Sequence, residues 1–311
     1  MSDAASAGAG TSFVAGVRTW ADMIKFAHSV FALPFALMAT FLAGRNLPEG
    51  RPGLLHLVLI VVCMVAARSV AMTFNRIADA RLDALNPRTA DRPLPAGKLT
   101  IAQAWVFLAL FFATFAAGCI SFFFWLGNPW PMWLGGPVLL FLCVYSFAKR
   151  FTRYAHFWLG AAIGLSPVAA WIAIDPASLG VPAVLLAATV TCWIAGFDII
   201  YACQDIAVDR REGLHSLPSR IGPRAALWVT RGLHLVVVVL LIALGRACGL
   251  GWLYHAGVAA VAVLLVIENA AVRADDFSRV NLAFFTINGL VSLALGACAI
   301  ADVLLGLAPI W

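Results

Sequence analysis

The sequence predicts an all-α membrane protein with nine transmembrane helices. Of its 311 residues, 63% are hydrophobic and only 12% are charged, and the mean hydropathy of +0.94 is far above that of soluble domains. Nine stretches come close to the roughly 20 apolar residues that a helix needs to cross a bilayer. Two of them are closely followed by aspartates four residues apart. We expect one polytopic domain over residues 1–311, with residues 1–17 as a flexible N-terminal tail.

The nine predicted spans are separated by short segments that hold most of the charged residues. Each span is an apolar run with few or no charges, which is typical of a helix in hydrocarbon. In chain order the predicted spans are Met23–Ala43, Leu54–Phe74, Ile101–Phe124, Met132–Phe147, Phe157–Ile174, Val181–Ile200, Ala225–Leu244, Trp252–Val272 and Leu282–Leu305.

The basic residues predict the orientation of the chain. Lysines and arginines gather near the N-terminus and after the second, fourth, sixth and eighth spans, whereas only Arg45, Arg51 and Arg246 lie on the other side. By the positive-inside rule, the N-terminus and both aspartate motifs face the cytoplasm, in a multi-pass protein of the inner (plasma) membrane. The net charge of +6 follows from this topology, so we expect the lipid bilayer and no nucleic acid as a partner.

In the first span, Lys25 and His28 lie one turn apart near the predicted cytoplasmic face. One interpretation is that both line a cavity that binds an anionic or phenolic group of an acceptor substrate. The other is that Lys25 extends its ammonium group to the membrane interface and only anchors the helix.

The second span contains Arg68 and leads into the first motif. An arginine inside a membrane is costly and indicates a function, although a structural salt bridge is an alternative. Arg68 precedes Asn75 by seven residues, or about 10 Å along nearly the same helix face. We therefore expect its guanidinium to bind the carboxylate of an aromatic acceptor.

The first motif consists of Asn75, Asp79 and Asp83, which share one face of a helix because they are four residues apart. Stacked carboxylates repel each other, so this face requires cations. Oxygen-only ligands suit Mg²⁺, which usually shares its coordination shell with waters and substrate phosphates.

A second motif repeats the first after the sixth span. Asp205 and Asp209 are again four residues apart, and Tyr201 takes the place that Asn75 has in the first motif. Two acidic faces on two membrane helices suggest one site that is approached from both sides. Asp198, seven residues before Asp205, is predicted to lie deep enough that it must be paired or protonated, and we place it with Tyr201 at the acceptor.

Basic segments follow both motifs and also the fourth span. The proline-rich loop from Ala84 to Leu99 suits a lid over a diphosphate, whereas the alternative is an ordinary cytoplasmic loop that obeys the positive-inside rule. For the basic residues at the end of span four, the alternative is a structural role, because a positive charge stabilises the C-terminus of any helix. The predicted diphosphate-binding residues are Arg88, Arg92, Lys149, Arg150 and Arg211.

The stretches NRIADARLD, RTADRPLP, YSFAKR and DIIYACQDIAVD, in this order and at these helix ends, resemble the UbiA-type intramembrane aromatic prenyltransferases over nearly the whole chain. The resemblance implies nine helices around a central cavity, open to the cytoplasm and to lipid. It also implies transfer of a polyprenyl group from polyprenyl diphosphate to an aromatic ring. Arg76 departs from the family pattern, in which an aspartate often follows the motif asparagine.

Carried over by motif, the resemblance implies that the first motif holds one Mg²⁺ and the second motif the other. Lys149 and the basic loops would then bind the diphosphate. The catalytic residues would be the four aspartates of the two motifs: Asp79, Asp83, Asp205 and Asp209.

Our principal hypothesis is a Mg²⁺-dependent 4-hydroxybenzoate-type polyprenyltransferase of quinone biosynthesis. An allylic diphosphate leaves readily when cations neutralise the charge that develops on its oxygens. The carbocation that results needs a dry apolar cavity, which a membrane bundle supplies. The first alternative is prenylation of a dihydroxynaphthoate in menaquinone biosynthesis, because Arg76 and the stretch FFTINGLVS resemble that branch. A cation channel or transporter and a noncatalytic lipid-binding scaffold are alternatives of other classes.

Overall fold

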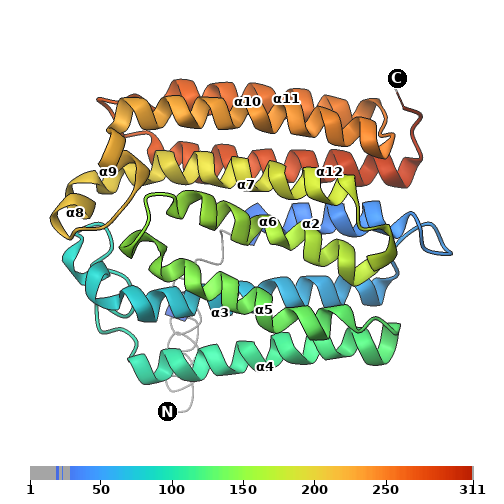
Figure 1. The fold of residues 1–311 in the computed structure, drawn as a ribbon, viewed down its shortest axis with the longest axis horizontal. Coiled ribbons are helices and arrows are strands. Elements are labelled where there is room, and N and C mark those ends of the chain that lie inside the picture. The colour runs from blue at the N-terminus through green and yellow to red at the C-terminus, as the bar shows by residue number, and fades with distance from the viewer. Residues whose placement is uncertain (1–18, 21–22, 24–28, 310–311) are drawn as a thin grey trace, which may run out of the picture.

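The computed structural model describes residues 19–20, 23 and 29–309 and is built from α-helices that run side by side (Figure 1). Within these residues, eight helices are long and apolar enough to cross a membrane, and α2 (Ser29–Gly44) adds a shorter apolar helix. The predicted all-α membrane fold is confirmed. The start of the first predicted span includes residues 24–28, which lie outside the described residues.

Short turns separate several of the helices. The helices are α2 (Ser29–Gly44), α3 (Leu54–Leu85), α4 (Ile101–Leu126), α5 (Trp130–Val144), α6 (Ala155–Ile174), α7 (Val181–Ala202), α8 (Ile206–Arg211), α9 (Leu217–Ile221), α10 (Pro223–Cys248), α11 (Trp252–Ala271) and α12 (Asn288–Leu305). The turns are η2 (Tyr145–Arg150), η3 (Pro176–Ser178), η4 (Cys203–Asp205) and the π-helical turn η5 (Leu282–Ile287).

The bundle closes because α2 and α12, the first and last of the helices named above for the described residues, pack together. Successive helices are neighbours from α3 to α7, α7 then packs on α10, and α10, α11 and α12 follow in turn. Helix α12 packs against α2, which itself packs on α6 and α3. Helix α2 therefore lies between the two halves of the bundle (Figure 1).

Helix α3 carries the first motif beyond the hydrocarbon layer. It has 32 residues, which correspond to about 48 Å against roughly 30 Å of hydrocarbon. The helix is continuous to Leu85, so the four-residue spacing keeps Asn75, Asp79 and Asp83 on one face. The site lies at the end of the bundle that also holds α8 and α9, on the left in Figure 1.

The second motif lies on a broken helix, which differs from the simple repeat that its spacing predicted. Helix α7 ends at Ala202, a 3₁₀ turn contains Asp205, and α8 contains Asp209. Tightening of the last turn is common at the C-terminus of an α-helix. The two motifs therefore share a spacing but not a backbone conformation.

Glycines bring α6 and α7 into close contact. A Cβ atom on Gly160 would lie 2.3 Å from the Thr191 carbonyl oxygen, and one on Gly164 would lie 2.4 Å from Thr191 Oγ1. Small residues four apart allow two membrane helices to approach in this way. The contact places His156, at the start of α6, beside Asp198 in α7.

Candidate functional site

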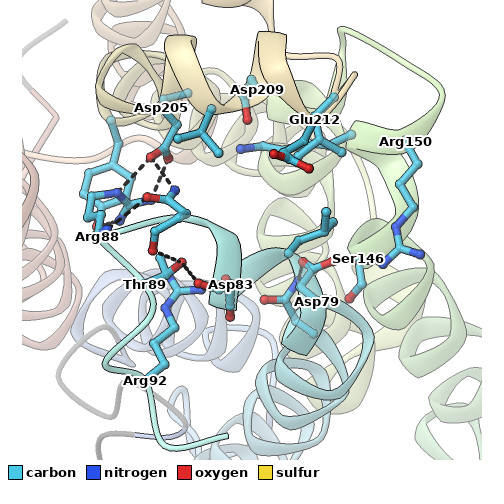
Figure 2. Close-up of a pocket in the computed structure, with 18 of the residues that line it drawn as sticks. Asp79, Asp83, Arg88, Thr89, Arg92, Ser146, Arg150, Asp205, Asp209 and Glu212 are labelled. Carbon is cyan, nitrogen blue, oxygen red and sulfur yellow. Dashed lines mark hydrogen bonds and ion pairs between the residues drawn. The ribbon is translucent and has the colours of Figure 1, made fainter. Parts of the chain in front are cut away.

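A cavity of about 190 Å³ lies where α3, η2 and α7 end. Figure 2 shows Asp79 and Asp83 on one side of it and Asp205 and Asp209 on the other. The two acidic motifs, far apart in the sequence, thus meet at one cavity. The predicted site residues that line it are Asn75, Asp79, Asp83, Arg88, Arg92, Lys149, Arg150, Asp198, Tyr201, Asp205 and Asp209.

In the first motif, both carboxylates are paired with arginines. Arg150 donates to Asp79 Oδ1 at 3.0 Å, and Arg92 donates to Asp83 Oδ1 at 2.6 Å. Asn75 Nδ2 donates to Asp79 Oδ2 at 3.0 Å, so the two residues hold each other on the helix face. These arginines supply the positive charge that the stacked carboxylates need.

In the second motif, Arg88 binds Asp205 through both arms of its guanidinium. Its Nε lies 2.9 Å from Asp205 Oδ1 and its Nη2 lies 2.5 Å from Oδ2, while Nη1 donates to the Tyr201 hydroxyl at 2.7 Å. Asn86 adds a hydrogen bond of 3.0 Å to Asp205 Oδ1. Burial alone would lower the pKa of Arg88, but the hydrogen bond and charge of Asp205 raise it above its usual value.

The donor set suits a metal that binds together with a substrate. Among the described residues, no three carboxylate, histidine or cysteine groups converge as a ready-made metal cage. Asp83 Oδ2 and Asp209 Oδ2 are buried and accept no hydrogen bond within the described part of the chain. Arg76 lies 3.9 Å from Asp83 Oδ2, beyond hydrogen-bond distance, so both oxygens keep lone pairs that a cation can use. Mg²⁺ characteristically takes one or two carboxylates and completes its shell with water and phosphate oxygens. The residues present therefore fit Mg²⁺.

The turn η2 places two cations at the cavity. Lys149 and Arg150 both line it, and the Lys149 carbonyl oxygen accepts a hydrogen bond of 2.7 Å from the His215 N–H. His215 belongs to the segment after α8, so η2 and the second loop are tied together. Arg150 also donates to the Ala78 carbonyl oxygen at 2.7 Å, which fixes it against α3.

Asp198 faces the cavity and is held by a buried histidine. His156 Nδ1 lies 2.6 Å from Asp198 Oδ2, and His156 Nε2 accepts a hydrogen bond of 3.2 Å from the Leu217 N–H. Because a backbone N–H donates to Nε2, the proton of the neutral ring is on Nδ1 and is donated to Asp198. The spacing of His156 in the sequence does not indicate this role, because it does not show which residue of a neighbouring helix the side chain meets.

Among the described residues, two predicted site residues, Arg211 and Arg68, do not line the cavity. Arg211 donates to Glu212 at 2.8 Å and to the Leu85 carbonyl oxygen at 2.9 Å, with a side chain that is 59% exposed. Arg68 lies seven residues before Asn75 in α3, and its Nε is buried without a hydrogen-bond partner among the described residues. Lys25 and His28 lie outside the described residues.

Two residues enter the site in ways that the sequence did not predict. Arg76 is buried, donates to the Met23 carbonyl oxygen at 3.3 Å and lies 3.9 Å from Asp83 Oδ2. Thr89 Oγ1 donates to the Asp83 carbonyl oxygen at 2.9 Å and so pins the loop to the end of α3. In the sequence Arg76 stands out only as a departure from a family pattern, because its burial beside Asp83 depends on contacts with residues distant in sequence, such as Met23.

Comparison with known proteins adds to this geometry. The model of the UbiA prenyltransferase family matches residues 32–290. A 4-hydroxybenzoate octaprenyltransferase of Marinobacter nauticus is 32% identical over 72% of this chain and 74% of its own, and one of Pseudomonas aeruginosa is 29% identical over 82% and 83%. A solved UbiA homologue of Aeropyrum pernix has a TM-score of 0.77 and 32% identity, covering 88% of this chain and 98% of its own. A homologue of Archaeoglobus fulgidus bound to GPP and Mg²⁺ shares the fold, with a TM-score of 0.69, 18% identity and 92% and 99% coverage.

Proposed function

Because this chain belongs to the UbiA prenyltransferase family, we propose that it transfers a polyprenyl group from polyprenyl diphosphate to 4-hydroxybenzoate, in a Mg²⁺-dependent step of quinone biosynthesis. The observation that carries the proposal is the meeting of two aspartate motifs across one cavity whose rim is rich in arginine. The relatives named 4-hydroxybenzoate octaprenyltransferase support this acceptor.

Asn75, Asp79 and Asp83 would hold one Mg²⁺, and Asp205 and Asp209 the other. When bound, the ions supply positive charge to the oxygens of the departing diphosphate. Asp83 Oδ2 and Asp209 Oδ2, which are buried and accept no hydrogen bond from the described residues, support this assignment. A channel or transporter is not favoured, since these four aspartates surround a single cavity and three of them are paired with arginines.

The arginines would exchange partners when substrate binds. Arg88, Arg92 and Arg150 each neutralise an aspartate in this structure. The motif aspartates would hold the divalent cations, which would supply that neutralising charge instead. The guanidinium groups of the three arginines would then bind the diphosphate, whose paired oxygens match their planar geometry. Lys149 adds a compact charge from the wall of the cavity, and the assignment of Arg211 to the diphosphate stays a prediction.

Asp198, Tyr201 and Arg68 would bind the acceptor, and Lys25 and His28 stay predictions for the same pocket. Asp198 lines the cavity, and one of its oxygens accepts a hydrogen bond from His156 Nδ1–H. Because this hydrogen bond fixes the carboxylate, its other oxygen would accept a proton or a hydrogen bond from the hydroxyl of the aromatic ring. His156 is accordingly a positioning residue.

Two amide substitutions separate the two hydrogen bonds of His156. In His156→Asn, the amide takes the place of Nδ1–H and keeps the donor to Asp198, whereas in His156→Gln the longer amide reaches the Leu217 N–H and leaves Asp198 without its donor. We expect His156→Gln to lower kcat/KM for the acceptor by about tenfold or more, the cost of one charge-assisted hydrogen bond. The KM for the prenyl diphosphate should change little, and His156→Asn should remain within about threefold of the wild type in a kinetic assay.

An Asp198→Asn background serves as the control for this pair. If His156 acts through Asp198, His156→Gln adds no further loss there, because coupled residues are not additive. Equal losses in both His156 variants, in parallel with equal losses in melting temperature, would show that His156 only supports the fold.

We place the site on the cytoplasmic side of the plasma membrane, because the loops at this end carry most of the basic residues. In a variant that lacks the seven cysteines, Lys98→Cys should react with a membrane-impermeant maleimide only after permeabilisation of cells. Arg51→Cys, in the exposed segment between α2 and α3, is the matched control and should react from outside. The opposite labelling pattern would reverse the proposed orientation.

The function is tested with purified protein, Mg²⁺, one polyprenyl diphosphate and a panel of hydroxybenzoates and dihydroxynaphthoates. We expect a prenylated hydroxybenzoate that forms only with a divalent metal. A product formed only from dihydroxynaphthoate would indicate a role in menaquinone biosynthesis instead. If no acceptor is prenylated, the proposed reaction is wrong.

A further inference from the structure

A second cavity, of about 760 Å³, lies between the start of α10 and the end of α11. It shares no lining residue with the cavity of the aspartate motifs, so the proposed prenyl transfer does not account for it. The start of α10 follows α9, at the same end of the bundle as the motifs (Figure 1). The polar and aromatic residues that line this groove are Arg224, Trp228, Arg231, Asn269, Arg273 and Asp275.

The groove has an excess of positive charge. Arg224, Arg231 and Arg273 line it against the single carboxylate of Asp275. Arg273 Nε lies 3.6 Å from Asp275 Oδ1, and both side chains are at least 75% exposed. An exposed pair of this kind contributes little, so the groove as a whole attracts anions.

Arg231 is the residue that the positive-inside pattern does not explain. It stands eight residues after Pro223, and with α10 centred on the bilayer its Cα lies roughly 7 Å inside the hydrocarbon layer. Its guanidinium lies over the Trp228 ring at 4.5 Å, and no carboxylate among the described residues pairs with it. A charged side chain at this depth is costly without a partner.

The exposed side chains around Arg231 are those of a surface in contact with lipid. Trp228 is 64% exposed and Leu235 is 67% exposed, and both share a helix face with Arg231 because they lie three residues before it and four after it. Tryptophan is typical of the membrane interface. An acyl chain can lie along Leu235 while its phosphate reaches the guanidinium, whereas a soluble anion would have to enter below the interface.

We propose that this groove binds the phosphate group of an anionic phospholipid from the adjacent leaflet. Arg231 binds the phosphate oxygens with its planar guanidinium held on Trp228, and Arg224 and Arg273 supply the charge around the head group. Basic pockets between membrane helices are suited to such head groups. The proposal concerns lipid binding and is independent of prenyl transfer.

The test measures lipid binding to delipidated, detergent-purified protein by native mass spectrometry and by thermal shift. The ligands are phosphatidylglycerol, phosphatidylcholine and inorganic phosphate. We expect one retained phosphatidylglycerol, a stabilisation that neither other ligand reproduces, and at least tenfold weaker retention in Arg231→Gln. Arg153→Gln is the matched control, since Arg153 also lies over an aromatic ring, at 5.0 Å from Tyr154, but lines neither cavity.

Three results would overturn the proposal. Equal retention of phosphatidylglycerol by the wild type and Arg231→Gln would remove the assigned phosphate ligand. Equal stabilisation by inorganic phosphate would make the ligand a soluble anion, and equal loss in Arg153→Gln would make the effect one of overall charge. If Arg231→Gln is not recovered folded, Arg224→Gln and Arg273→Gln together give the same comparison, with unchanged retention counting against the proposal.

Discussion

We expect Asp79→Asn and Asp205→Asn each to lower Mg²⁺-dependent turnover by about two to three orders of magnitude, the scale of losing one electrostatic contact to a developing oxyanion. Each substitution removes one charge from a metal-binding motif and leaves the shape of the side chain unchanged. Asparagine also keeps an oxygen that Arg150 or Arg88 can contact, so the fold should persist. The measurement is kcat/KM for the prenyl diphosphate at increasing Mg²⁺ concentrations, together with the melting temperature.

Asp175→Asn is the matched control for these two variants. Asp175 lies at the opposite end of α6 from His156, where its carboxylate accepts hydrogen bonds from Asn46 at 3.1 Å and from the Ala177 N–H at 3.2 Å. We expect its turnover to equal that of the wild type. Near-normal Mg²⁺-dependent turnover in Asp79→Asn or Asp205→Asn would reject the two-metal assignment.

Arg88→Gln is expected to have two opposite effects on binding. It removes the bidentate partner of Asp205, so Mg²⁺ added without diphosphate should bind more tightly, because it no longer displaces a guanidinium at 2.5–2.9 Å. It also removes a ligand of the diphosphate, so KM for the prenyl diphosphate should rise about tenfold to a hundredfold, as for one or two charge-assisted hydrogen bonds. Calorimetric titration of metal and steady-state kinetics measure the two effects separately.

Arg81→Gln is the matched control for Arg88. Arg81 is exposed on the same end of α3, between Asp79 and Asp83 in sequence, but it does not line the cavity. Its removal changes the net charge equally and should alter neither metal affinity nor KM. If Arg88→Gln weakened metal binding instead, Arg88 would be a support for Asp205 in both states, and the proposed exchange of partners would be wrong.

Local patterns in the sequence predicted the parts of the molecule that depend on one helix at a time. Apolar runs predicted the membrane helices, because each run must satisfy its backbone hydrogen bonds inside the bilayer. The four-residue spacing predicted that Asn75, Asp79 and Asp83 share a face, because α3 is continuous through all three. The same spacing was less informative at Asp205 and Asp209, where η4 interrupts the helix.

The contacts between helices were decided only by the tertiary structure. Arg88 meets Asp205 across 117 positions of the chain, and His156 meets Asp198 across 42. These pairs depend on the rotation and the separation of neighbouring helices, which for α6 and α7 follow from the fit of Gly160 and Gly164 against Thr191. A helical period states which residues share a face of their own helix, but it does not state what that face touches. The sequence by itself therefore determined the class of fold and the acidic motifs, whereas packing decided which arginines neutralise Asp79, Asp83 and Asp205 and which histidine orients Asp198.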